Sequence, residues 1–240
     1  MDQLKIADRY KKILHRFTQD LKDVYPEGLV SLILYGSAAS GEFVDKHSNL
    51  NLLAVLKDTD LEVLKRSSKL VRQFTMINTL FLTESYIGHS LDVFPIEFLD
   101  MRENYVVLYG KDVLKDMQID TRNLRFQCEQ ELKAKLLTLR QAYVLKHDNP
   151  SELRRLLLVS FTSVLHVARN VLRVKGKKPP YLKHEVVKEL ASELKIDPGI
   201  WGKILAAKNN RIDPGKKETG QLFAGFVKDL ESIVTIVDEL

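Results

Sequence analysis

Two short apolar runs, separated by a segment containing glycine and serine, constrain the fold of this chain more than any other feature. Leu29 to Tyr35 (LVSLILY) and Asn49 to Leu56 (NLNLLAVL) are rich in aliphatic residues, and glycines bound the first run. Runs of this length and composition are typical of strands that are buried on both faces. The sequence therefore predicts a sheet that is covered on both sides, with these two strands consecutive along the chain.

Helical patterns flank the two strands. Apolar residues recur at three- and four-residue steps over residues 6–24, before Pro26-Glu27-Gly28, which predicts an amphipathic helix. A capping sequence predicts a second helix over about residues 59–78. Strand material is expected again within residues 79–101, most clearly in LDVFPIEFLDM, where Pro95 favours an edge or a bulge. The order of helix, strand, strand, helix and strand predicts a small α/β or α+β unit.

Only helical patterns follow residue 120. Helices are expected at about residues 122–147, 150–175, 184–194, 200–207 and 219–240. Several helices with short connections are typical of a bundle. The sequence thus predicts an α+β domain over residues 1–120 and an all-α helical bundle over residues 121–240.

Charge is distributed unevenly between these halves. Residues 1–120 carry 15 Lys and Arg against 18 Asp and Glu, and residues 121–240 carry 22 against 14. A positive field favours anionic partners such as a nucleotide, RNA or an acidic protein. We therefore expect the basic C-terminal half to be the candidate surface for acidic protein or RNA.

Composition and cysteine content narrow the class of protein. Hydrophobic content of 45% and charged content of 29% are typical of a globular chain. The longest apolar stretch, Leu156 to Ala168, is shorter than the ~20 residues of a membrane span, so a buried helix and no membrane partner are expected. No secretory signal pattern opens the sequence, and the single cysteine, Cys128, excludes an intramolecular disulfide. The expected location is cytoplasmic.

The segment between the two runs resembles a known signature. Gly36-Ser37 directly after a strand, then Gly41, then a strand that opens Ser48-Asn49-Leu50-Asn51, is similar to the DNA polymerase β-like nucleotidyltransferase superfamily. In that superfamily a glycine-serine turn precedes an aspartate-x-aspartate strand. The resemblance implies a nucleotidyltransferase fold over roughly residues 28–115. Relatives such as the aminoglycoside nucleotidyltransferases follow this domain with a helical bundle.

The resemblance also assigns site residues. Gly36, Ser37, Gly41 and Ser48 correspond to the nucleotide- and phosphate-binding turn, and Asn49 and Asn51 stand at the positions of two family carboxylates. The family places a third carboxylate on a later strand. Glu97 is the preferred candidate, because it lies in FPIEF, the most strand-like part of this segment, and Asp92 is the alternative. The two are an odd number of residues apart, so on a regular strand they face opposite ways and only one can join the site.

Asparagine at both motif positions alters the expected chemistry. Three carboxylates would hold the Mg²⁺ ions that align a triphosphate and neutralise the leaving pyrophosphate. Asn49 and Asn51 each remove a negative charge and place an NH₂ donor where a metal-binding oxygen is expected. No metal site and no cofactor are therefore expected, and the amides are suited to donate hydrogen bonds to phosphate oxygens.

Three functions follow from this sequence. The leading hypothesis is a degenerate nucleotidyltransferase that has lost catalysis and is retained for nucleotide, anion or partner binding. The first alternative is an active Mg²⁺-dependent enzyme that transfers a nucleoside monophosphate to a hydroxyl of a small molecule or protein. The second is a structural protein-interaction module.

Overall fold

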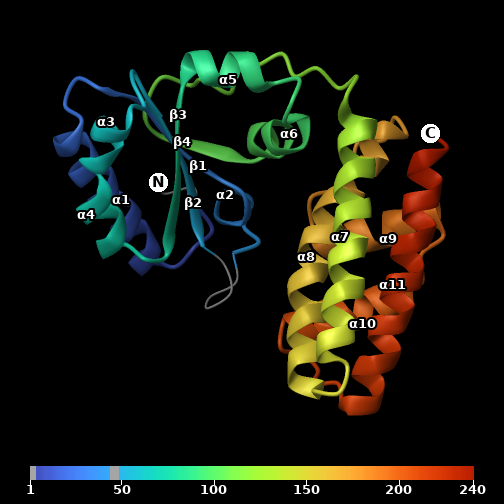
Figure 1. Ribbon diagram of the computed structural model, residues 1–240. Coiled ribbons are helices and arrows are strands. Elements are labelled where there is room, and N and C mark those ends of the chain that lie inside the picture. The colour runs from blue at the N-terminus through green and yellow to red at the C-terminus, as the bar shows by residue number, and fades with distance from the viewer. Residues whose placement is uncertain (1–3, 44–48) are drawn as a thin grey trace. The chain divides into compact units, whose positions relative to one another are not determined.

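The computed structural model describes residues 4–43 and 49–240. It divides the chain into two compact units, residues 1–120 and 121–240, and each is described separately. The first unit contains a four-stranded sheet with helices on both of its sides (Figure 1). Its helices are α1 (Asp8–Val24), α2 (Ser37–Ser40), α3 (Leu61–Lys65), α4 (Ser68–Gln73), α5 (Glu84–Ser90) and α6 (Pro95–Glu103).

The sheet is mixed, with the strand order β3-β2-β1-β4. Its strands are β1 (Leu29–Tyr35), β2 (Leu50–Leu56), β3 (Ile77–Thr83) and β4 (Tyr105–Gly110). Strand β1 pairs antiparallel with both β2 and β4, whereas β2 and β3 are parallel. The two strands predicted first are thus the two central strands, and the apolar runs that identified them are almost entirely buried.

Side chains that alternate along β1 and β2 divide between two apolar clusters. Leu32 and Leu34 belong to the cluster that includes residues of α1 and α4, such as Phe17 and Leu70. Ile33 alternates with them and joins a second cluster, which includes residues of α5 and α6. Helices α1, α3 and α4 lie on one side of the sheet and α5 and α6 on the other (Figure 1). The predicted burial of both faces is confirmed.

Two predictions in this unit are wrong, and one strand is missing from them. The helix expected to run to Asn78 is two short helices, α3 and α4, and β3 begins at Ile77, whose side chain enters the core. The segment LDVFPIEFLDM contributes no strand, since it forms a turn and helix α6, with Pro95 in the first helical turn. Proline suits that position because its missing N–H has no intrahelical acceptor there. Strand β4 was not predicted.

The second unit is an all-helical bundle, as predicted. Its helices are α7 (Leu124–Lys146), α8 (Pro150–Val174), α9 (Lys183–Leu194), α10 (Pro198–Lys208) and α11 (Lys216–Asp238). Phe161, Trp201 and Phe226 pack together with ring centroids 5.4–5.9 Å apart. The Trp201 indole donates a hydrogen bond to the Asp229 carboxylate at 2.9 Å. Aromatic contacts between α8, α10 and α11 therefore centre the core.

Helix α8 is the one helix in residues 4–43 and 49–240 whose length and apolar composition match a membrane span. In its most apolar window, 56% of the residues are buried inside the structure. Leu157, Val164 and Val171 face the bundle core, because all three are almost completely shielded from solvent. A helix in the core of a bundle has the same apolar composition, so packing in this core explains the apolar sequence of α8.

Candidate functional site

The turn at the end of β1 requires glycine at both predicted positions. Gly36 has φ 76° and ψ −146°, and Gly41 has φ 85° and ψ 10°. Side chains disfavour positive φ, so glycine alone adopts these conformations at low cost. Between them lies α2, which is a single turn whose first residue is Ser37. The Ser37 carbonyl accepts a hydrogen bond from the Ser40 hydroxyl at 3.1 Å.

Asn51 lies against this turn. It is half-buried on β2 and pairs with Tyr35, the residue that directly precedes Gly36. A Cβ atom placed on Gly36 would lie 3.4 Å from Nδ2 of Asn51. The amide nitrogen of Asn51 therefore stands beside the glycine backbone.

The other predicted residues differ in their placement. Asn49 is exposed and immediately precedes β2. Ser48 lies outside the described residues. Glu97 is half-buried in helix α6, and Asp92 is exposed in the turn that precedes it. The prediction that Glu97 or Asp92 lies on a strand is therefore wrong, because neither residue belongs to the sheet.

A residue that the sequence reasoning missed lies beside Asn51. Strand β3 runs parallel to β2, and Asn78 is the register partner of Asn51. Side chains in register on parallel strands point to the same face, so both amides lie on the face that carries Leu53 and Val55. The alternating pattern INTLFLT was the available signal, but the predicted helix extended over its start.

Asn78 and Asn51 begin a row of register partners that crosses the sheet from β3, and two tyrosines continue this row on β1 and β4. Tyr35 pairs with Asn51 on one side and with Tyr105 of β4 on the other. Burial raises the pKa of the Tyr35 hydroxyl. Burial also raises the pKa of Tyr105, whose hydroxyl donates a hydrogen bond to the Asp112 carboxylate at 3.0 Å. Both hydroxyls therefore remain neutral at physiological pH.

The described side chains do not fit the Mg²⁺ ions that the resemblance implies. Strands β1 to β4 read LVSLILY, LNLLAVL, INTLFLT and YVVLYG, and none contains Asp, Glu, His or Cys. Over residues 4–43 and 49–240, no group of three or more such side chains could hold a metal ion. Mg²⁺ prefers carboxylate and water oxygens in octahedral geometry. The neutral amide of Asn51 beside Gly36 is a poor substitute.

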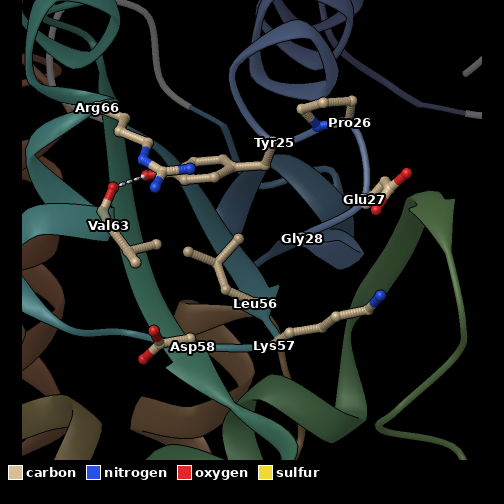
Figure 2. Close-up of a pocket in the computed structure, with 9 residues that line it drawn as sticks. All are labelled: Tyr25, Pro26, Glu27, Gly28, Leu56, Lys57, Asp58, Val63 and Arg66. Carbon is tan, nitrogen blue, oxygen red and sulfur yellow. Dashed lines mark hydrogen bonds between the residues drawn. The ribbon is translucent and has the colours of Figure 1, made fainter.

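A surface cavity of about 360 Å³ lies at the other end of the central strands. The Tyr25 ring, Leu56 and Val63 form its wall, and the Tyr25 hydroxyl donates to the Val63 carbonyl at 2.9 Å (Figure 2). Leu56 pairs with Leu29 at the start of β1, whereas Asn51 pairs at its end. Six residue steps separate these positions, or roughly 20 Å along the strand. The cavity is therefore distinct from the glycine turn.

Comparison with known proteins supports the class that this architecture defines. A mixed four-stranded sheet with flanking helices, followed by a helical region, is the nucleotidyltransferase fold with its C-terminal extension. A solved structure, spectinomycin adenyltransferase AAD(9) from Enterococcus faecialis with ATP and spectinomycin, matches with a TM-score of 0.58. The match covers 92% of this chain and 99% of that chain at 10% sequence identity. It therefore shows the fold alone.

Comparisons at the level of sequence find no relative. No family model matches the chain, and no curated protein matches it. The fold predicted from the resemblance is confirmed by the structural match, and the roles of the site residues remain predictions.

Proposed function

We propose that this nucleotidyltransferase-fold protein binds a nucleotide or another anionic ligand beside Gly36 without carrying out metal-dependent transfer. The observation that carries the proposal is the position of Asn51, whose amide nitrogen stands beside the glycine turn. The match to a structure solved with ATP supports a nucleotide as the first ligand to test.

The chemistry of amides suits this function. An amide donates hydrogen bonds to phosphate oxygens, and a hydrogen bond to a charged group contributes about 1.5–3 kcal/mol. A carboxylate at the same place would repel the phosphate unless a cation lay between them. Binding is therefore expected to persist when divalent cations are removed, and pyrophosphate is not expected to form.

Calorimetry tests this proposal. ATP, GTP, CTP and UTP are titrated into the protein with EDTA and, separately, with Mg²⁺. We expect binding in EDTA that Ser37→Trp abolishes, because the large side chain occupies the turn. Ser163→Trp is the matched control, since Ser163 is exposed on α8 in the other unit. If no nucleotide binds under either condition, the proposal is wrong.

A second candidate is an active transferase that moves a nucleoside monophosphate to a hydroxyl of a small molecule or protein. The extent of the structural match favours it, because 92% of this chain and 99% of the adenyltransferase are covered. Pyrophosphate release with Mg²⁺ and a nucleoside triphosphate is the measurement. Release that Ser37→Trp abolishes would establish catalysis and overturn the leading proposal.

The basic helical unit supports a third candidate, an interaction module for RNA or an acidic protein. Part of its charge is paired internally, since Glu193 forms ion pairs with Lys175 at 3.1 Å and Lys177 at 2.8 Å. This unit has 22 basic and 14 acidic residues, so its net charge stays positive and would attract an anionic partner. Affinity for RNA that falls steeply with salt would support this candidate. If the protein binds a nucleotide and shows no RNA binding, the leading proposal is favoured.

A further inference from the structure

We infer that Asn78 is the third residue of the site beside Gly36. Amides then replace carboxylates at three positions of this site rather than two. Asn78 is then a third ligand-binding residue beside Asn49 and Asn51. The part of this inference that concerns the ligand rests on the proposed function. The part that concerns the position of the third side chain does not.

Strand register places Asn78 at the site. Parallel pairing joins Leu50 to Ile77, Asn51 to Asn78 and Leu52 to Thr79. Leu50, Leu52 and Ile77 all enter the core cluster on the α1 face, so Asn51 and Asn78 share the opposite face. Neighbouring strands lie about 4.8 Å apart. Two side-chain amides at that separation can contact the same ligand atom or neighbouring atoms.

The other candidates for a third position lie elsewhere. Glu97 lies in α6 and Asp92 in the preceding turn, outside the sheet. Strand β4 pairs with β1, so Tyr105 is two strands away from Asn51, or roughly 10 Å. A later strand that adjoins β2 can only be β3, and its residue beside Asn51 is Asn78.

The row has a consistent donor character. Asn51 and Asn78 each offer an NH₂ group, and Tyr35 beside Asn51 carries a hydroxyl whose raised pKa keeps it protonated. Asn78 is exposed and Asn51 half-buried, so the row is open at the β3 edge. Neutral donors at adjacent strand positions suit an oxyanion with several acceptor atoms, such as a phosphate chain free of metal.

Cation binding by charge-restored variants tests the position of Asn78. The double variant N49D/N51D restores two carboxylates, and N49D/N51D/N78D restores three. The matched control is N49D/N51D/L80D, because Leu80 pairs with Leu53 and lies on the same face of β3. It adds the same charge about 7 Å further along the strand. Mn²⁺ affinity is measured by electron paramagnetic resonance, with circular dichroism to verify folding.

We expect N49D/N51D/N78D to bind Mn²⁺ at least tenfold more tightly than both the double variant and the L80D control. Equal affinity of the double and triple variants would overturn the inference, since Asn78 would then be irrelevant to the site. Equal affinity of the N78D and L80D triples would overturn it too, because negative charge anywhere on β3 would suffice.

Nucleotide binding in EDTA tests Asn78 as a ligand-binding residue. We expect Asn78→Ala and Asn51→Ala each to weaken ATP binding at least fivefold, and Leu80→Ala to leave it within twofold. ATP binding that Asn51→Ala weakens and Asn78→Ala does not would refute this role of Asn78. If the unmodified protein binds no ATP, the proposed function and this role both fail, and the Mn²⁺ measurement still decides the position.

Discussion

Gly36→Ala tests whether the glycine turn determines the site. The Gly36 conformation, with φ 76° and ψ −146°, is one that residues with a Cβ atom rarely adopt. Backbone strain of this kind costs about 1–3 kcal/mol. The added Cβ would lie 3.4 Å from Nδ2 of Asn51, which is close to ordinary contact, so strain rather than collision dominates. We take the loss of stability as about 2 kcal/mol.

Hydrogen exchange of the β1 and β2 amides is the assay for this variant. Amides that exchange through unfolding of the first unit are expected to exchange roughly 30-fold faster, because 1.4 kcal/mol corresponds to a factor of ten. Trp201 is the single tryptophan and lies in the second unit, so its fluorescence follows that unit independently. ATP binding in EDTA is expected to weaken in the same variant, since relaxation of the turn displaces Asn51.

Gly88→Ala is the matched control within the same unit. Gly88 lies in α5, and a Cβ atom there would meet nothing within 4 Å. Alanine in a helix is favoured over glycine by about 0.5–1 kcal/mol, so this variant is expected to be slightly more stable. Unchanged exchange and unchanged ATP binding in Gly36→Ala would refute the argument that this turn requires glycine.

Three further predictions concern charge and packing. Stability is expected to fall above about pH 10, because burial disfavours ionisation of Tyr35 in the folded state and not in the unfolded chain. Denaturant titrations should show a smaller fall for Tyr35→Phe. Asn51→Asp is expected to lose about 1–2 kcal/mol of stability in EDTA at pH 8, because the charged carboxylate is half-buried, and to lose less as the pH falls and the carboxyl takes up a proton, as thermal melts would measure. Trp201→Phe removes the indole hydrogen bond to Asp229 from a fully buried position, so the free energy of unfolding in urea is expected to fall by about 2–3 kcal/mol. An unchanged urea midpoint would contradict the assignment of Trp201 to the centre of the core.

The position of each strand in the sheet explains which strands the sequence predicted. Strands β1 and β2 are central, so they are buried on both faces and read as continuous apolar runs. Strands β3 and β4 are the two edges, and most of their residues are half-buried or exposed. Their weaker patterns left the start of β3 inside a predicted helix and β4 unpredicted. Short mixed segments of this kind are ambiguous by periodicity alone.

The same cause limited the prediction of the site. Gly36, Gly41 and Asn51 were assigned because the order of strand, glycine-serine turn and second strand resembles a family signature that is visible in one short stretch of sequence. Asn78 meets Asn51 only through strand pairing, which a single sequence does not specify. Glu97 was assigned instead because FPIEF alternates like a strand, although Pro95 begins a helix there. Residues joined by long-range register are therefore the ones that required the structure.

Folding and metal binding place separate demands on this sheet. Asparagine has nearly the shape of aspartate, so an amide at Asn51 preserves the β2 register and the contact with Gly36 while removing the charge. The fold is consequently compatible with both an active and an inactive site. The order of affinities for free ATP and for its Mg²⁺ complex distinguishes the two. A neutral donor row gains most from a phosphate chain whose charge no cation has already neutralised. Free ATP is therefore expected to bind more tightly than its Mg²⁺ complex, whereas a site retaining two-metal chemistry would show the opposite order.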